Sequence, residues 1–308
     1  KYIMRVDDDV GPDIEIEYGK EDEEKMRDSV NYFFRPFDFT KELPYKIKII
    51  CTAESDILAI HSDHSILDGT GLGVFFKEYI MLNEGAELPL PAIQYRDFAL
   101  WQQKLIKSDY IKPQREFWHN LMKLPVSPLK FPIDIPEADL SLKTSRTFEF
   151  KVNTGHFEDI QRYAANSGIT LQMYFTSLVG ILMHKYTGQE DILFVYPMAC
   201  RKLPEFAEVI GLFCETFPMR FDVKPEKSIR DYLGEVKKIS VAVINNQDFP
   251  FDVLREELGL SEREIAYDSL FGLGFSYLDT EIAGGNLEDF GISHYPLKLE
   301  ADLRFPLL

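Results

Sequence analysis

The sequence predicts a mixed α/β protein built of two lobes. Segments that alternate apolar and polar residues, as half-buried strands do, are interleaved with segments whose apolar residues recur at helical spacing. The chain has 308 residues, which is long for one domain and sufficient for two. A proline-rich stretch with little periodicity begins at residue 125. We therefore expect one lobe over residues 1–143 and a second over residues 144–308.

In the first lobe, residues 45–49 alternate apolar and polar side chains, and residues 57–60 form a short apolar run after a turn at 54–56. The two segments predict a β-hairpin. A polar, glycine-rich loop over 61–73 leads into a helix that ends near Asn83. The spacing of apolar residues predicts two further helices, over 94–107 and 113–124.

The second lobe is expected to begin with a strand over 147–152, where aromatic and polar residues alternate. Thr170 is a suitable N-cap for a helix that is apolar almost all round and should therefore be buried. The remaining expected elements are a helix over 157–166, strands over 192–196, 217–223 and 271–277, and an amphipathic helix over 229–244.

The charge of the chain argues against two classes of partner. The sequence has 51 acidic and 34 basic residues, which gives a formal net charge of −17. Such a surface repels the phosphates of nucleic acids and the head groups of anionic lipids. No apolar run is long enough to span a bilayer, and no signal peptide opens the chain. We expect a cytoplasmic protein that binds neither nucleic acid nor membranes.

The three cysteines, Cys51, Cys200 and Cys214, form no CxxC pair and have no metal-ligand spacing. Each lies in an apolar stretch, where cysteine usually serves as a small buried side chain. The sequence therefore predicts neither a metal site nor disulfides, in keeping with a reducing compartment.

The loop that follows the predicted hairpin contains the best candidates for chemistry. His64 lies at the end of a strand, where scaffolds often display catalytic side chains, and its ordinary pKa of about 6.5 suits a general base. Asp68 could fix the loop by facing a cation, or it could orient the histidine ring. Gly69 and Gly71 allow tight turns and close approach. By itself, a histidine and an aspartate at this spacing more often have a structural role.

Four other histidines are expected at the surface or in packing contacts: His119, His156, His184 and His294. His61 is closer to the loop, but if the strand continues it points to the opposite face from His64.

Six segments in the same order resemble the motifs of condensation domains from non-ribosomal peptide synthetases. Residues 63–69, DHSILDG, resemble the HHxxxDG signature. The others are YRDFALW at 95–101 (YxDYAxW), PMACR at 197–201 (PxAGR), IGLFCETFPMR at 210–220 (IGxFxNTxPxR), NQDFPF at 246–251 (HQDxPF) and LFGLGFSYLD at 270–279 (LFxxxFxYxx). The order of six motifs is far more specific than any one of them.

The resemblance implies a fold of two chloramphenicol acetyltransferase-like lobes arranged in a V, with a tunnel between them and with both ends of the domain truncated in this chain. Donor and acceptor carrier proteins would bring substrates tethered to phosphopantetheine, so the domain itself would hold no cofactor. An adenylation domain would lie nearby in a larger synthetase. The implied reaction is acyl transfer that forms an amide bond.

The resemblance also implies roles for individual residues. His64 would be catalytic, and Asp68 would be structural and paired with Arg201. Asp63 and Gly69 would support the site. Three positions would line the tunnel: Gly211, Glu215 and Ser276.

Two departures from the family pattern matter most for the predicted chemistry. Asp63 replaces the first histidine of the signature and, with Asp68, resembles the DxxxxD core of heterocyclisation domains. Those domains lack the histidine, and Gly71 stands at the position of their serine. Glu215 replaces the asparagine of the IGxFxNT motif.

Three alternatives remain open at the level of sequence. One is a stand-alone, CoA-dependent acyltransferase of the same superfamily. The second is a non-catalytic, condensation-like docking module that recruits a tailoring enzyme, and the third is an epimerisation domain.

Overall fold

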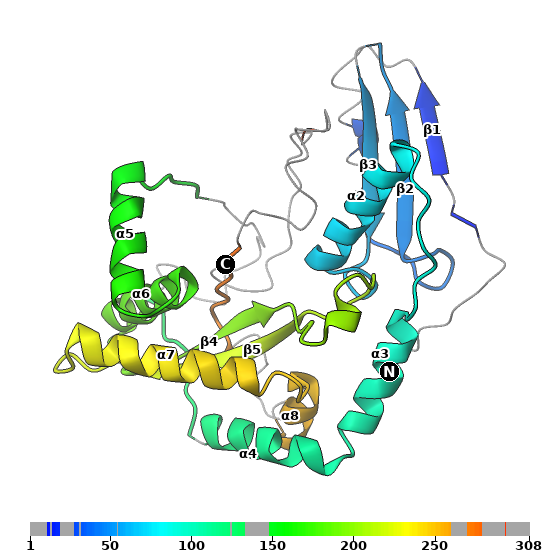
Figure 1. The fold of residues 1–308 in the computed structure, drawn as a ribbon. Coiled ribbons are helices and arrows are strands. Elements are labelled where there is room, and N and C mark those ends of the chain that lie inside the picture. Colours follow the sequence, from blue (N-terminus) through cyan, green and yellow to red (C-terminus); the bar gives the residue numbers. More distant parts are fainter. Residues whose placement is uncertain are drawn as a thin grey trace. The chain divides into compact units, whose positions relative to one another are not determined.

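The computed structural model describes residues 11–12, 14–18, 28–30, 32–53, 55–123, 125–132, 148–259, 270–278 and 293. The chain divides into two compact units (Figure 1). Unit 1 is drawn from Lys1–Tyr95, Glu208–Leu212 and Glu281–Leu299. Unit 2 is drawn from Arg96–Ala207, Phe213–Thr280 and Glu300–Leu308.

These units interleave along the chain, so no single cut in the sequence separates them. Residues 96–132 group with unit 2, although the sequence places them in the first lobe. The expected lobe boundary at residue 143 lies outside the described residues and stays a prediction.

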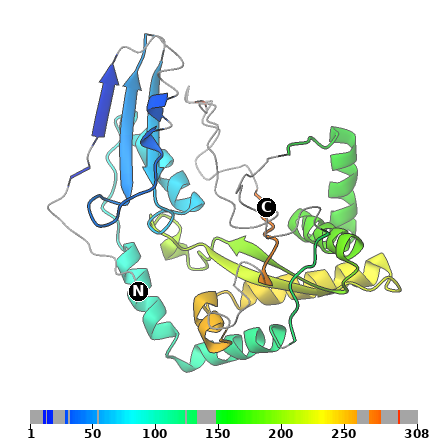
Figure 2. The same ribbon diagram turned by 180° about the vertical axis from the view of Figure 1, so that it is seen from behind.

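A three-stranded sheet forms the centre of unit 1, in the order β1 (Ile14–Tyr18), β2 (Tyr45–Cys51) and β3 (Asp56–Ser62). Strands β2 and β3 form the predicted antiparallel hairpin, with Ile47 opposite Ile60. Strand β1 runs parallel to β2 and was not predicted from the sequence. Helix α2 (Gly69–Asn83) lies on one face of the sheet, and the helical residues 28–30 and 32–33 lie on the other (Figures 1 and 2).

A buried lysine joins β1 to the rest of the sheet. The side chain of Lys48 on β2 is only 6% exposed, and its Nζ lies 2.9 Å from carboxylate oxygens of both Glu15 and Glu17 on β1. It also donates to Ser29 Oγ at 2.8 Å. Burial lowers the pKa of Lys48, but the two carboxylates outweigh burial and the net pKa is raised. Lys48 therefore keeps its positive charge, because both carboxylates lie within ion-pair distance of its Nζ.

In unit 2, strands β4 (Asp191–Met198) and β5 (Glu215–Asp222) form an antiparallel pair. Helices α6 (Leu171–Thr187) and α7 (Ile229–Asn245) pack against this pair and against each other. An isolated bridge joins Val195 of β4 to Gly274, and the described residues 271–277, predicted as a strand, contain bridge residues at Leu273 and Gly274 but no extended strand. The other elements are α3 (Tyr95–Leu105), η1 (Asp109–Ile111), α4 (Lys112–Leu121), α5 (Thr154–Asn166), η3 (Pro204–Phe206) and α8 (Phe251–Glu257).

Helix α6 begins where the sequence predicts. The Thr170 hydroxyl accepts a hydrogen bond from the Met173 amide at 3.1 Å, and Gly188 ends the helix with a φ of 69°. The prediction that the helix is buried all round is wrong in part, because one row of side chains is exposed: Leu178, Leu182 and Tyr186.

The strand predicted at 147–152 is also wrong over the described residues 148–152, which form no ladder. Phe148 and Phe150 are 86% and 77% exposed. Alternation of apolar residues specifies a strand only where a neighbouring strand pairs with it and one face is covered.

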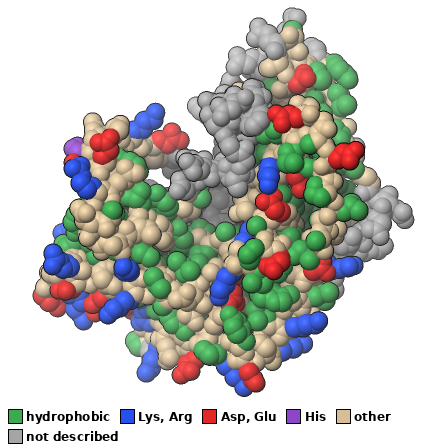
Figure 3. Space-filling view, in the orientation of Figure 1, with side chains coloured by type: hydrophobic (Ala, Val, Ile, Leu, Met, Phe, Trp, Pro, Cys, Tyr) green, Lys and Arg blue, Asp and Glu red, His purple; other side chains and the backbone are tan. Residues whose placement is uncertain are grey.

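Acidic and basic side chains are interspersed on the face shown in Figure 3. None of the three cysteines forms a disulfide, and each is partly rather than fully buried. Among the described helices, none is long and apolar enough to cross a membrane.

Arg220 on β5 ties helix α4 and the chain that follows it to the sheet of unit 2. Its Nε and Nη2 donate to both carboxylate oxygens of Asp191, at 2.8 and 2.7 Å. The remaining donors bind three backbone carbonyls between 2.8 and 3.0 Å, those of Leu121, Lys123 and Pro125. All five N–H groups of the guanidinium are therefore used.

We expect Arg220→Lys to lower the free energy of unfolding by about 2–4 kcal/mol, because an ammonium cannot reproduce a bidentate pair together with three carbonyl contacts. Urea denaturation would measure the change. The matched control is Arg162→Lys, at an exposed arginine on α5 that pairs with Asp159. Equal stability of the two variants would show that the contacts of Arg220 contribute no more to stability than those of the exposed Arg162.

Candidate functional site

The loop between β3 and α2 displays His64 at the surface of unit 1. Its ring Nδ1 lies 3.0 Å from the carbonyl oxygen of Leu67. A carbonyl oxygen can only accept a hydrogen bond, so Nδ1 carries a hydrogen, and in the neutral ring Nε2 therefore carries the lone pair. The loop thus presents the imidazole in the tautomer that can accept a proton at Nε2.

Asp63, which stands where the family has a histidine, builds the turn that carries His64. Its carboxylate accepts a hydrogen bond from the Ser65 amide at 2.9 Å, and its own amide donates to the Pro44 carbonyl at 2.8 Å. An aspartate that binds the amide two residues ahead forms an Asx turn. This residue therefore has a clear structural contribution within the loop.

Asp68 is the N-cap of helix α2. Asp68 is 3% exposed, and its carboxylate accepts a hydrogen bond from the Gly71 amide at 2.7 Å. The backbone is extended at Asp68 (ψ 174°) and becomes helical at Gly69. Asp68 therefore sets the first turn of the helix. The expected pairing with Arg201 would join the two units and stays a prediction.

The glycines of the site differ in how closely they are packed. A Cβ at Gly69 would meet nothing within 4 Å. A Cβ at Gly71 would lie 3.0 Å from Leu67 Cδ1 and 3.3 Å from the Asp68 carboxylate. A Cβ at Gly211 would lie 2.2 Å from Tyr95 Cδ2, closer than any side chain could tolerate. Gly71 and Gly211 are thus the positions where close packing demands glycine.

Tyr95 is the residue of this site that the sequence analysis missed. Its hydroxyl donates to the Leu212 carbonyl at 2.8 Å, although the two residues are 117 positions apart. The YRDFALW motif at residues 95–101 was the available signal, but the resemblance assigned no role to its tyrosine.

The remaining expected site residues belong to unit 2, apart from Gly211. Arg201 donates to the Phe206 carbonyl at 2.6 Å, and its guanidinium lies 4.0 Å from the centre of the Phe213 ring. Ser276 is exposed. Whether Gly211, Glu215 and Ser276 line a common tunnel stays a prediction.

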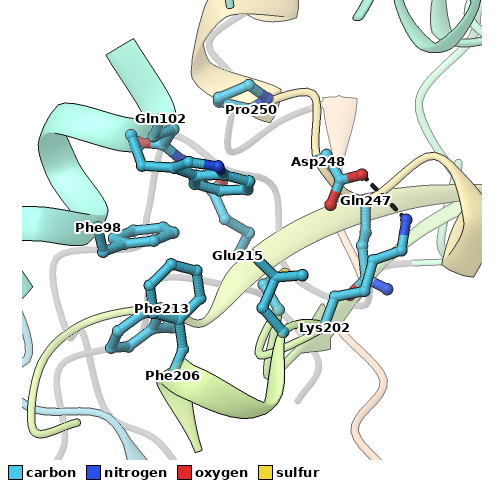
Figure 4. A pocket seen from close by; sticks show the side chains of 12 residues that line it. Phe98, Gln102, Lys202, Phe206, Phe213, Glu215, Gln247, Asp248 and Pro250 are labelled. Carbon is cyan, nitrogen blue, oxygen red and sulfur yellow. Dashed lines mark hydrogen bonds and ion pairs between the residues drawn. The ribbon is translucent and has the colours of Figure 1, made fainter. Parts of the chain in front are cut away.

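Glu215 borders a pocket in unit 2 that has an aromatic wall and a polar edge (Figure 4). Lys202 and Asp248 form an ion pair of 3.0 Å at that edge. The other lining residues are Phe98, Trp101, Gln102, Cys200, Leu203, Phe206, Phe213, Gln247 and Pro250.

Burial raises the pKa of Glu215 to about 7, and the charge of Asp252 adds to the effect. The Phe251 amide, in the first turn of α8, donates to the carboxylate and offsets part of the shift. The N-cap residue of α8 is Pro250, whose side chain accepts no hydrogen bond from the first turn of the helix. Glu215 therefore serves as the cap from a distant strand, and it is largely uncharged below neutral pH.

Cys200 stands where the family pattern has glycine, and its φ is 52°, in the left-handed region. Burial is the main cause that raises the pKa of its thiol, and nearby Glu215 adds to it. The thiol is therefore protonated at neutral pH and a poor nucleophile.

We expect the stability of the protein to fall as the pH rises from about 4.5 to above 7, because the folded pKa of Glu215 lies above its unfolded value. The protonated carboxyl is favoured at low pH, and this advantage is lost once the buried group ionises. A shift of this size corresponds to about 3 kcal/mol at most. Glu215→Gln should remove this dependence and should be more stable than the parent protein at pH 8.

Urea denaturation at pH 5 and pH 8 would test this expectation. Glu158→Gln, at an exposed position of α5, is the matched control and should leave the difference between the two pH values unchanged. The same difference in the Glu215→Gln variant would contradict the assignment.

Comparisons with known proteins agree on one family. The family model for the condensation domain matches residues 2–301. Bacitracin synthase 3 of Bacillus licheniformis is 30% identical over 309 residues, which cover 97% of this chain and 5% of that protein. Gramicidin S synthase 2 of Aneurinibacillus migulanus is 27% identical over 95% of this chain and 6% of its own length.

Solved structures support the same fold. The X-domain in the complex with OxyB from teicoplanin biosynthesis matches with a TM-score of 0.79 and 18% identity, over 98% of this chain and 67% of that one. The first condensation domain of the calcium-dependent antibiotic synthetase matches with a TM-score of 0.62 and 17% identity, over 80% of this chain and 59% of that one. The chain spans about one twentieth of the length of the two synthetases.

Proposed function

The chain belongs to the condensation-domain family of non-ribosomal peptide synthetases, and on that premise we propose that it forms an amide bond between two carrier-bound substrates. The acceptor amine attacks the carbonyl carbon of the donor thioester. The C–N bond forms, the C–S bond breaks, and the donor carrier leaves as a thiol. The observation that carries the proposal is the exposed His64, held as the Nδ1–H tautomer by the Leu67 carbonyl.

His64 has the proton-transfer role in this scheme. Its Nε2 accepts the proton that the attacking amine loses, and the imidazolium then returns that proton to the departing thiolate. The hydrogen bond from Nδ1 to Leu67 supports this role, because it stabilises the ring in both protonation states and fixes its orientation. The proton balance closes within the site, and no external base is needed.

Asp63 and Asp68 act as structural residues in the proposed reaction. The Asp63 carboxylate is engaged by the Ser65 amide, and the Asp68 carboxylate by the Gly71 amide. Both contacts favour condensation over heterocyclisation, which would need these aspartates for chemistry.

The proposal includes the expected surroundings of the domain. Two lobes in a V with a tunnel between them would admit carrier-tethered phosphopantetheine from both sides, with Gly211, Glu215 and Ser276 along the tunnel and Arg201 paired with Asp68. An adenylation domain and donor and acceptor carriers would lie in the larger synthetase. The multidomain synthetases that resemble this chain support these partners.

A docking module is the second candidate function. The teicoplanin X-domain, which has a similar fold, was solved in complex with OxyB. The departures at Asp63 and Glu215 are the features of this sequence that favour such a role. The two functions differ in what they require of His64. Condensation requires the Nδ1–H tautomer, whereas docking of another protein does not.

We expect His64→Ala to lower the rate of dipeptide formation by roughly 10²–10⁴-fold, as loss of a general base does, with little change in stability. The assay uses two loaded carrier proteins and single-turnover conditions. His156→Ala, at an exposed position on α5, is the matched control and should retain the parental rate. Condensation by the His64 variant at the control rate would remove His64 from the mechanism.

Asp68→Ala removes the cap of α2, which alone lowers the free energy of unfolding by about 1–2 kcal/mol, and it also removes the proposed partner of Arg201. Asp68→Asn should cost less, since the amide oxygen can still accept from Gly71. A larger loss in both variants, about 3–5 kcal/mol and shared by Arg201→Ala, would indicate the buried ion pair with Arg201. An inactive Asp68→Ala variant with parental stability would instead assign Asp68 a direct chemical role.

A further inference from the structure

A short segment from distant sequence packs against the loop that carries His64. This segment, Glu208–Leu212, belongs to the same compact unit as the loop and is called the strap below. The Asp68 amide donates to the Gly211 carbonyl at 3.2 Å, and the Tyr95 hydroxyl donates to the Leu212 carbonyl at 2.8 Å. At its start, Glu208 pairs with Lys77 of α2 at 2.9 Å, but both side chains are well exposed and this contact contributes little.

Gly211 fits between an aromatic ring and the first turn of α2. On one side, a Cβ at Gly211 would lie 2.2 and 2.7 Å from Cδ2 and Cγ of Tyr95. On the other, a Cβ at Gly71 would lie 3.4 Å from the Gly211 amide nitrogen. The backbone of the strap can reach the Asp68 amide only because neither glycine carries a side chain.

One peptide unit connects the strap to the catalytic histidine. The bond between Leu67 and Asp68 has its carbonyl on the Leu67 side and its amide on the Asp68 side. The carbonyl accepts from His64 Nδ1 at 3.0 Å, and the amide donates to Gly211 at 3.2 Å. Because a peptide unit is planar, both bonds fix the orientation of the same rigid group. A hydrogen bond donated by the amide also polarises the carbonyl and strengthens the bond that it accepts.

We propose that Tyr95 and Gly211 are positioning residues: through the strap they hold the Leu67–Asp68 peptide, and through that peptide they hold His64 as the Nδ1–H tautomer. Their effect on catalysis rests on the proposed condensation function. Their effect on the tautomer of His64 is independent of that function, since it follows from hydrogen bonds within unit 1. Neither residue needs to touch a substrate.

The decisive variant is Tyr95→Phe, which keeps the ring against Gly211 and removes only the hydroxyl that binds Leu212. Nitrogen chemical shifts of ¹⁵N-labelled histidine, assigned with the His64→Ala variant, report the tautomer of His64 directly. We expect the Nδ1–H fraction to fall in Tyr95→Phe. In the carrier-protein assay, kcat should fall by roughly tenfold while KM for either carrier stays unchanged, as loss of one orienting hydrogen bond predicts.

Gly211→Ala tests the other contact. The new Cβ cannot coexist with the Tyr95 ring, so the strap must move away and the loss in the Nδ1–H fraction should exceed that of Tyr95→Phe. Adding Tyr95→Ala removes the ring and makes room for the Cβ, so the double variant should regain part of what Gly211→Ala loses. Tyr79→Phe, at an exposed tyrosine of α2, is the matched control and should leave both readouts at parental values.

The two readouts separate failure of this proposal from failure of the proposed function. Parental nitrogen shifts in both Tyr95→Phe and Gly211→Ala would overturn the positioning role, even if the variants melt earlier. Altered shifts in both variants would uphold that role. If the parent protein then forms no dipeptide from loaded carriers, the condensation function fails while the strap keeps its assignment.

Discussion

The hydrogen bond between the Asp68 carboxylate and the Gly71 amide is the interaction on which the site in unit 1 depends. It ends the extended chain at Asp68 and starts helix α2 at Gly69. Since β3 ends at Ser62, only six residues remain to connect the strand and the helix. Asp63 folds the first part of that connection into a turn, and His64 is left at the surface. The buried Asp68 carboxylate thus fixes the end of this connection by binding the Gly71 amide.

The site is held by backbone groups more than by side chains. Leu67 orients His64 through its carbonyl, and Gly211 holds Asp68 through its carbonyl. Such contacts survive most substitutions at the residues that provide them, but they require the two segments to approach closely. That requirement falls on Gly71 and Gly211, where a Cβ would meet neighbouring atoms at 3.0 and 2.2 Å. The two glycines therefore largely determine the conformation of the loop, although they have no functional group.

Features that depend on residues close together in the sequence were predicted from local sequence patterns. The hairpin of β2 and β3, the helix that follows Asp68 and the Thr170 cap of α6 were predicted correctly, because each depends on neighbours within a few residues. Strand β1 and the interleaved units were not predicted, because they depend on pairing between distant segments. At the candidate site, His64 and Asp68 were predicted from the resemblance of six ordered motifs, because their spacing alone more often indicates a structural role. Tyr95 was missed because its partner is 117 residues away.

The departures from the family pattern act through different physics in the two units. In unit 1, the Asp63 carboxylate accepts a hydrogen bond from the Ser65 amide, and the turn formed in this way accommodates Asp63 in the loop. In unit 2, Cys200 adopts a φ of 52° that favours glycine, and Glu215 is buried with a pKa of about 7. The Glu215 amide donates to the Cys200 thiol, so these two substitutions are neighbours and share one pocket. A side chain in the left-handed region costs about 1–2 kcal/mol, and an ionised buried carboxylate adds to that cost as the pH rises. The first departure is therefore a matter of loop shape, whereas the pair in unit 2 makes the stability of that unit sensitive to pH.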